Sequence, residues 1–191
     1  LILCGGIESE LLTEDTAIPY KPTVSVFGRV VTDGSHPVRS ADQDPSGYVR
    51  AWMGIVKSSN TAANYVAQAV FAGQLPTGNT FSKEQVLPYE GSGRLDAMLR
   101  DFGFGAYTGF DLGGARGGES RGTLPPQSEW TQAPRPEVYA MRNVVPSLAQ
   151  GYQVQVTGLQ MLSCFNAIAT GGTRMRPYVV EKVVDRDGKV I

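Results

Sequence analysis

The sequence predicts an α+β fold in which helices form the larger part and two short β elements the smaller. Apolar residues recur at helical spacing in four stretches, alternate along one stretch near the N-terminus, and accumulate as valines before a turn near the C-terminus. The 191 residues are long enough to bury a core of their own, and we expect one domain over residues 1–191.

The first predicted element is a strand over residues 22–31. Val24, Val26 and Val30 lie on one alternating face, and Asp33-Gly34 follows as a turn. A polar loop rich in turn-forming residues comes next.

Two helices follow, separated by the triplet Ser58-Ser59-Asn60. Each has an apolar stripe at the spacing that buries one face of a helix. The two stripes consist of Val49, Trp52, Met53 and Val56, and of Ala62, Tyr65, Val66, Ala69 and Val70.

Two further helices are predicted by their end signals as well as by periodicity. Gly103 suits the left-handed position after the third helix, and Ser92 is placed to cap its start. The fourth helix begins with a capping box, Thr157-x-x-Gln160, and ends at Gly171-Gly172. Their stripes are Leu95, Met98, Leu99 and Phe102, and Met161, Leu162, Phe165 and Ile168.

The remaining stretches predict loops and a β-hairpin. Residues 72–90 and 103–136 hold Gly and Pro without a helical period, so both are predicted to be irregular. Tyr178 to Val184 predicts a strand, Asp187-Gly188 a turn, and Lys189-Val190-Ile191 the start of a return strand.

Composition excludes several classes of function. The formal net charge of −1 gives no electrostatic case for nucleic acid or an anionic membrane. No stretch of 18 apolar residues is present, so nothing in this sequence predicts a membrane span. Cys4 and Cys164 are too few for a zinc site and are expected to be buried thiols that stay protonated. No metal and no organic cofactor is implied.

Two features invite a functional interpretation but favour a structural one. His36 is the single histidine and lies in a polar loop far from a nucleophile signal, so we expect a surface residue. The Gly-rich run from Gly113 to Glu119 lacks the residues of a phosphate-binding loop, and a surface loop is the better interpretation.

Paired carboxylates occur at three places near predicted turns. Two acids side by side suit glycoside hydrolysis, but turns and helix caps use the same residues more often. The pairs are Glu14 with Asp15, Asp42 with Asp44, and Asp185 with Asp187.

The triplet Ser58-Ser59-Asn60 gains weight from the motifs that follow it. Alone it is explained by Ser59 or Asn60 capping the next helix. The ordered series resembles the transpeptidase domain of class B penicillin-binding proteins over nearly all of residues 1–191. Its further members are Phe102-Gly103-Phe104-Gly105, Thr108 to Leu112, Gly118 to Pro125, Gln150 to Met161, and Ala167 to Gly172 with Arg176-Pro177.

The resemblance implies a serine D,D-transpeptidase that cross-links peptidoglycan stem peptides and is acylated by β-lactams. Ser58 and Asn60 match the S-x-N motif of the family. The first would pass a proton to the leaving group, and the second would orient the acyl-amide carbonyl of the substrate. Ser59, at the variable middle position, is the predicted substrate-binding residue. The implied fold is of the penicillin-binding and serine β-lactamase type, outside the cytoplasm, with this chain supplying mainly its helical half.

The departures from the family pattern are as informative as the matches. Neither the S-x-x-K motif nor the K-T-G motif occurs in the 191 residues, and Gly158 replaces the usual Pro. We therefore expect part of a catalytic domain whose nucleophile lies outside this chain, on a longer parent anchored in the membrane or on a companion chain. The alternative is a non-catalytic relative that serves as a binding or scaffold module. A third possibility is an unrelated helical module, in which case the motif series would be a coincidence.

Overall fold

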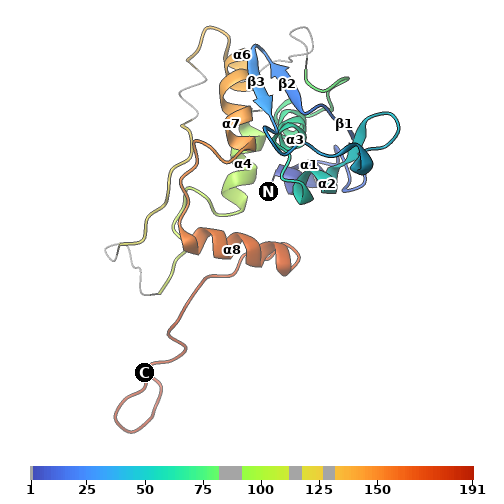
Figure 1. Cartoon of the computed structure of the whole chain (residues 1–191). Coiled ribbons are helices and arrows are strands. Elements are labelled where there is room, and N and C mark those ends of the chain that lie inside the picture. The colour runs from blue at the N-terminus through green and yellow to red at the C-terminus, as the bar shows by residue number, and fades with distance from the viewer. Residues whose placement is uncertain (1, 82–91, 112–117, 127–131) are drawn as a thin grey trace. The chain divides into compact units, whose positions relative to one another are not determined.

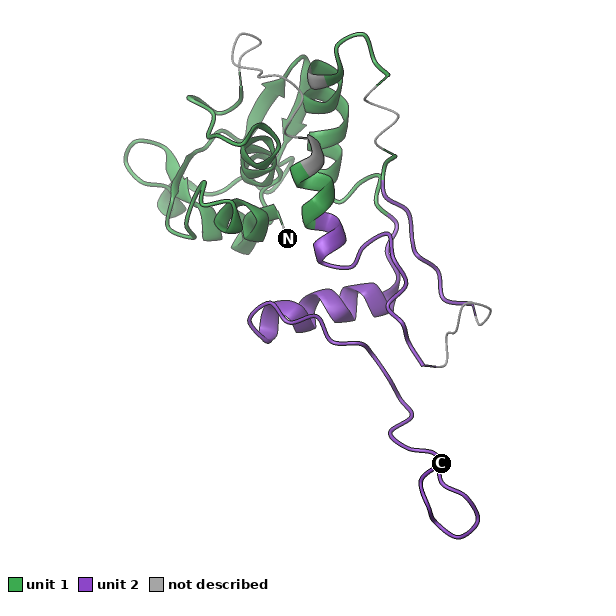
Figure 2. Ribbon diagram, turned by 180° about the vertical axis from the view of Figure 1, so that it is seen from behind, with its two compact units in different colours: residues 1–98, 125–154 green, residues 99–124, 155–191 purple. Residues whose placement is uncertain are grey.

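The computed structural model describes residues 2–81, 92–111, 118–126 and 132–191. Its helices and short antiparallel strand pairs confirm the α+β class. The chain divides into two compact units (Figure 2). Unit 1 comprises Leu1–Met98 and Pro125–Val154, and unit 2 comprises Leu99–Leu124 and Gln155–Ile191. The single domain expected over the whole chain stays a prediction.

Helix α3 (Asn60–Ala72) is the central element of unit 1, with 10 of its 13 residues buried. It packs against α1 (Ile2–Glu8), α2 (Ala51–Val56), α7 (Val145–Ala149) and β3 (Arg29–Thr32), as Figure 1 shows. The stripe predicted for this helix is confirmed, since none of its members is more than 4 % exposed. They are Ala62, Tyr65, Val66, Ala69 and Val70.

The apolar stripe predicted for the helix that precedes α3 is wrong. Val49 lies in strand β4 (Tyr48–Arg50), and Val56 at the end of α2 is 64 % exposed. The buried face of α2 instead carries small residues such as Gly54. A Cβ on Gly54 would lie 2.8 Å from the Cβ of Ala62, so close packing against α3 selects the small side chain.

The strand predicted over residues 22–31 is a hairpin of two strands. Strand β2 (Thr23–Val26) pairs antiparallel with β3, and the turn residues Phe27-Gly28 have φ angles of 49° and 85°. Because the chain reverses direction at this turn, the valines before and after it no longer follow one alternating pattern. Val31, which is 1 % exposed, therefore faces the core, whereas Val30 is 65 % exposed.

A second strand pair was not predicted. Strand β1 (Ala17–Pro19) pairs antiparallel with β4. Each strand has only three residues, too few for an alternating pattern to be visible in the sequence. The loop between the two strand pairs contains one 3₁₀ turn, η1 (Ser40–Asp42).

A helical run near residue 140 was also missed. It consists of α6 (Pro136–Tyr139), the π-helical turn η4 (Ala140–Val144) and α7. Pro146 lies inside the run, at the start of α7, directly after the π-helical turn; it has no N–H to donate, and the hydrogen-bond pattern of the run changes at this point. The buried apolar residues are Ala140, Met141, Val144, Val145 and Leu148.

Helix α4 (Ser92–Asp101) passes from unit 1 into unit 2 and follows the prediction. Gly103 beyond its end has a φ of 90°, the left-handed conformation that ends the helix. The capping role predicted for Ser92 lies outside the described side chains. The confirmed stripe residues are the buried Leu95, Met98 and Leu99.

Helix α8 (Gly158–Ala169) begins as predicted but buries a different face. Both bonds of the capping box are present: Thr157 N donates to Gln160 Oε1 at 2.9 Å, and Gln160 N donates to Thr157 Oγ1 at 3.1 Å. The predicted stripe is wrong, since Leu162, Phe165 and Ile168 are 59 %, 64 % and 47 % exposed. The buried face is Gln160, Ser163, Cys164 and Ala167.

The prediction of a strand near the C-terminus is also wrong. Residues 178–184 form no ladder, and the predicted hairpin is reduced to one bridge between Val184 and Val190. The turn itself is confirmed, because Asp185 Oδ1 accepts hydrogen bonds from the amides of Asp187 and Lys189. A strand requires a neighbour that satisfies its amides, and no other described segment pairs with this one.

Candidate functional site

The turn between α2 and α3 presents the triplet Ser58-Ser59-Asn60 in three different environments. Ser58 is exposed and has a φ of 51°, in the left-handed region that non-glycine residues seldom adopt. Such strain concentrates at functional sites, where the surrounding structure enforces it. Within the described chain the Ser58 hydroxyl makes no hydrogen bond, so it is available to a ligand.

Ser59 points into the protein and caps α3. Its Oγ accepts from Ala62 N at 3.1 Å, and it donates to Asp33 Oδ2 at 2.9 Å. The side chain is 2 % exposed, so this hydroxyl is fully used by the fold. The capping explanation is therefore confirmed, and the substrate-binding role of Ser59 stays a prediction.

Asn60 is half-buried at the first position of α3. Its Nδ2 donates to the carbonyl of Thr32 at 2.9 Å, which ties the amide to the end of β3. An asparagine amide has two N–H donors and a carbonyl acceptor. The bond to Thr32 uses one donor and fixes the plane of the amide, leaving the second donor and the carbonyl for a ligand.

Asp33 anchors this turn from beneath, a role that the sequence did not reveal. The residue is 8 % exposed, and its carboxylate accepts hydrogen bonds from Tyr20 Oη at 2.8 Å, Ser59 Oγ at 2.9 Å and Thr61 N at 3.0 Å. One buried acceptor therefore fixes both residues that flank Asn60.

Tyr20 shares this buried network. Its hydroxyl donates to Asp33 and accepts from Val38 N at 2.8 Å. Burial and the neighbouring carboxylate of Asp33 raise the pKa of Tyr20 to about 12, against the opposing effect of the bond from Val38.

A groove of about 400 Å³ opens beside the triplet in unit 1. Ser58 and Asn60 line it together with Ile2 and Leu3 of α1 and with Gln150 at the end of α7. The groove therefore brings together three stretches that lie far apart in the sequence. Its remaining lining is apolar or small, which suits an uncharged peptide-like ligand held by a few polar groups.

The motif residues of unit 2 form a separate hydrogen-bonded framework. Glu119 accepts from the amide of Thr108 at 2.6 Å and from its hydroxyl at 2.5 Å. Burial raises the pKa of Glu119, but the bonds from Thr108, Gly109 and Phe110 outweigh it and hold the pKa below its usual range.

Gln160 completes this framework from α8. Its Nε2 donates at 2.8 Å to the carbonyls of both Ala106 and Arg121, while its Oε1 closes the capping box. The glutamine is fully buried because the loops around it supply partners for every polar atom it brings.

The other sequence candidates fall in turns or on the surface. His36 is exposed, as predicted. Asp44 and Asp185 use their carboxylates to accept backbone amides in turns, and Asp42 pairs with Lys57 at 2.9 Å. Most of the Gly113 to Glu119 run lies outside the described residues.

The cysteines are partly as predicted. Cys164 is buried and Cys4 half-buried, and neither forms a disulfide in the described chain. Over the same residues no three His, Cys, Asp or Glu side chains gather where they would hold a metal ion. No described helix has the length and hydropathy needed to cross a bilayer.

Comparison with known proteins identifies the family. The model of the penicillin-binding protein transpeptidase domain matches residues 3–190. Penicillin-binding protein PbpB of Mycobacterium tuberculosis is 31 % identical over 124 residues, 65 % of this chain and 16 % of that protein. Stage V sporulation protein D of Bacillus subtilis is 27 % identical over 137 residues, 72 % of this chain and 18 % of that protein.

A solved structure extends the likeness to the fold. Penicillin-binding protein 3 of M. tuberculosis, complexed with aztreonam, matches with a TM-score of 0.67 and 25 % identity, covering all of this chain and 33 % of that one. The chain spans less than a fifth of the length of each of the two curated relatives named above. The ordered motifs, the fold and the family match agree, and the chain belongs to the penicillin-binding protein transpeptidase domain family.

Proposed function

We propose that the groove beside Ser58 and Asn60 forms one wall of the active site of a serine D,D-transpeptidase. This enzyme cross-links peptidoglycan stem peptides and is acylated by β-lactams. The observation that carries the proposal is the S-x-N turn, which opens onto a groove of about 400 Å³ next to the first turn of α1. The family match over residues 3–190 supports the same assignment.

Ser58 is proposed to act in proton transfer. Its exposed hydroxyl has no hydrogen-bond partner among the described residues, and its left-handed backbone holds it at the mouth of the groove. A hydroxyl in this position relays a proton between basic groups and the leaving amine, which is general acid–base catalysis.

Asn60 is proposed to orient the substrate. The bond to Thr32 leaves one amide N–H and the amide carbonyl available in the groove. These two atoms complement an amide bond, which offers one acceptor and one donor of its own. A fixed amide therefore aligns the scissile peptide for attack.

The nucleophile and its base are proposed to come from polypeptide outside residues 1–191. The sequence contains neither S-x-x-K nor K-T-G, and covalent catalysis requires an activated nucleophile. We further propose that the parent protein is anchored in the membrane and works at its outer face. A separate companion chain that carries the serine is the other arrangement to be tested.

The test is the rate at which a fluorescent penicillin acylates the full-length protein. We expect the wild type to be labelled, and Ser58→Ala and Asn60→Ala to be labelled about 100-fold more slowly. Labelling of a co-purified polypeptide instead would identify a companion chain as the carrier of the serine.

Asn79→Ala is a matched control for the asparagine. Asn79 is also half-buried in unit 1 and its Nδ2 donates to a backbone carbonyl, that of Pro19 at 2.7 Å, but it does not line the groove. Wild-type rates are expected for this variant. A wild type that binds penicillin reversibly without a covalent adduct would favour a non-catalytic binding module and refute the enzyme assignment.

A further inference from the structure

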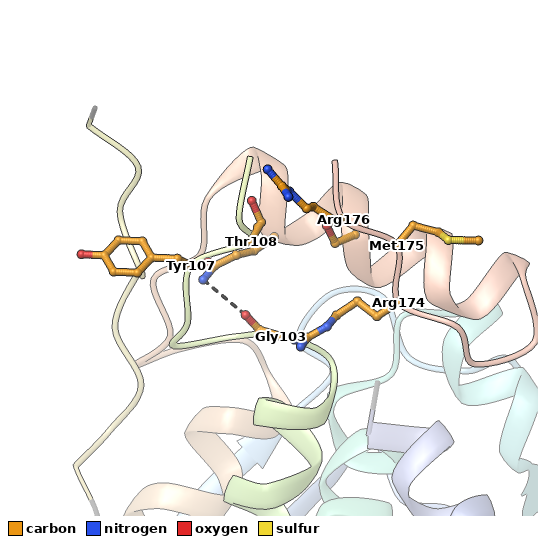
Figure 3. A pocket seen from close by; sticks show the side chains of 8 residues that line it. Gly103, Tyr107, Thr108, Arg174, Met175 and Arg176 are labelled. Atoms are coloured by element: carbon orange, nitrogen blue, oxygen red, sulfur yellow. Dashed lines mark hydrogen bonds between the residues drawn. The ribbon is translucent and has the colours of Figure 1, made fainter. Parts of the chain in front are cut away.

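A small cavity in unit 2 has no role in the proposed transpeptidase reaction. Its volume is about 150 Å³, and it lies between the turn after α4 and the segment that follows α8 (Figure 3). Pockets for drug-sized ligands usually measure about 300–1,000 Å³, so this one suits a single small group.

Two arginines from one extended segment line this cavity. Side chains alternate in direction along extended backbone, so Arg174 and Arg176 extend to the same side of the segment, as Figure 3 shows, and Met175 between them also contributes to the lining. The Arg176 Nε donates to the carbonyl of Gly109 at 2.6 Å, which fixes that guanidinium in place.

Arg174 lies against the backbone of a glycine. A Cβ on Gly103 would lie 2.5 Å from Arg174 Nη1, so the guanidinium lies close against the backbone at this glycine and would have to shift if the residue were larger. No hydrogen bond or ion pair within the described residues occupies the Arg174 guanidinium. Its donors are therefore available to a ligand.

A serine hydroxyl adds a third donor. Ser163 lines the cavity from α8 and is 6 % exposed, yet its side chain has no hydrogen-bond partner in the described chain. Gln160, one turn earlier, has all its polar atoms satisfied by protein groups. The Ser163 hydroxyl is therefore available to donate to a ligand in the cavity.

No carboxylate lines the cavity to neutralise the two arginines. The Glu119 carboxylate lies behind Thr108, whose amide and hydroxyl donate to its Oε1. Asp111 accepts from the amides of Val179 and Val180. The charged groups that line the cavity are therefore the two guanidinium groups.

We propose that this cavity binds a compact oxyanion, the carboxylate or phosphate group of a ligand, held by Arg174, Arg176 and Ser163. The planar guanidinium groups match the paired oxygens of such a group, and the serine hydroxyl supplies a third bond. The proposal is independent of the transpeptidase assignment, since none of these residues lines the groove beside Ser58.

The test uses inorganic phosphate and acetate as separate probes of the full-length protein. Each anion is titrated at constant ionic strength, with chloride as the balancing ion, and the melting temperature is followed. We expect saturable stabilisation, because a ligand that binds only the folded state raises stability with its concentration. Tighter binding of phosphate would identify a phosphate ligand, and tighter binding of acetate a carboxylate.

Variants decide whether the stabilisation arises in this cavity. Arg174→Ala and Arg176→Ala are expected to raise the half-saturating concentration about tenfold or more, and Ser163→Ala about threefold. Arg186→Ala, which removes an exposed arginine of unit 2 outside the cavity, is the matched control and should bind as the wild type does. Arg174→Lys keeps the charge and preserves folding if the alanine variant is unstable.

The proposal is overturned if neither anion gives saturable stabilisation of the wild type. Loss of binding in Arg186→Ala equal to that in Arg174→Ala would also overturn it, because the effect would then be general charge screening.

Discussion

Replacing Asp33 by alanine is the sharpest test of how the fold supports the S-x-N turn. The carboxylate is buried and accepts three hydrogen bonds of 3.0 Å or less, from Tyr20 Oη, Ser59 Oγ and Thr61 N. Removing it leaves the tyrosine hydroxyl and the threonine amide buried without an acceptor. Ser59 keeps its contact with Thr61 Oγ1 at 3.2 Å and still caps α3.

The expected loss of stability follows from these contacts. A hydrogen bond to a charged group contributes about 1.5–3 kcal/mol, and breaking a buried charged network costs about 3–5 kcal/mol because the contributions are not additive. We therefore expect Asp33→Ala to lose about 3–5 kcal/mol in unit 1. Asp33→Asn should lose about 1–2 kcal/mol, because one amide oxygen still accepts from Thr61 N.

Hydrogen exchange of α3 in the full-length protein measures this loss where it occurs. A loss of 3 kcal/mol corresponds to about 100-fold faster exchange of the protected amides. The control is Asp44→Ala, which also removes a carboxylate that accepts two backbone amides, but from an exposed turn. Exchange of α3 that is no faster in Asp33→Ala than in this control would show that Asp33 does not anchor the turn.

Three further predictions concern pH, backbone geometry and the S-x-N turn. Below the ordinary tyrosine pKa of about 10, Tyr20 is protonated in both the folded and the unfolded state. Between pH 10 and about pH 12, only the folded state retains the proton. The free energy of unfolding should therefore fall by at most about 1.4 kcal/mol per pH unit between these two pH values. Urea unfolding across this range measures the slope, and a Tyr20→Phe variant with an unchanged slope would contradict it. Gly122→Ala should lower the melting temperature far more than Gly188→Ala. Both positions have positive φ, but only at Gly122 would the new Cβ lie 2.1 Å from a backbone atom, the carbonyl oxygen of Gln155. Equal shifts of the melting temperature would contradict this prediction. Ser58→Gly should stabilise unit 1 by about 1 kcal/mol, because glycine adopts the left-handed backbone at this position without strain. The same variant should slow acylation as much as Ser58→Ala does. A destabilised Ser58→Gly variant would show that the φ of 51° carries no strain.

Periodicity found the helices more reliably than it found their buried faces. In α3 the apolar residues are also the buried ones, so the prediction and the structure agree. In α2 and α8 the larger apolar side chains are exposed, and small or polar residues such as Gly54 and Gln160 face the protein. Spacing alone cannot tell which face packs when close approach or a buried hydrogen-bond network decides it.

The errors in the β elements have a different origin. The turn at Phe27-Gly28 divides an apparently continuous strand, and its left-handed residues carry no Asn-Gly or Asp-Gly signal. The valine-rich segment at residues 178–184 has strand propensity but no partner to pair with among the described residues. Propensity therefore predicted extended backbone without predicting its partner.

The candidate site was only half visible in the sequence. The S-x-N triplet stood out because other family motifs follow it in order. Asp33 did not, because its role arises from three partners that lie 13, 26 and 28 residues away along the chain. The Asp33-Gly34 pair predicted a turn, and nothing local distinguishes an aspartate in a turn from one that anchors a second loop far along the chain.

The most direct test of the central claim is the intact mass of the full-length protein after incubation with a penicillin. We expect the mass to increase by one drug molecule. Proteolysis should map this adduct to the serine of an S-x-x-K motif outside residues 1–191, and Ser58→Ala should suppress it at short times. A wild-type protein that is folded, carries that motif and still gains no mass would contradict the assignment of this groove to a transpeptidase active site.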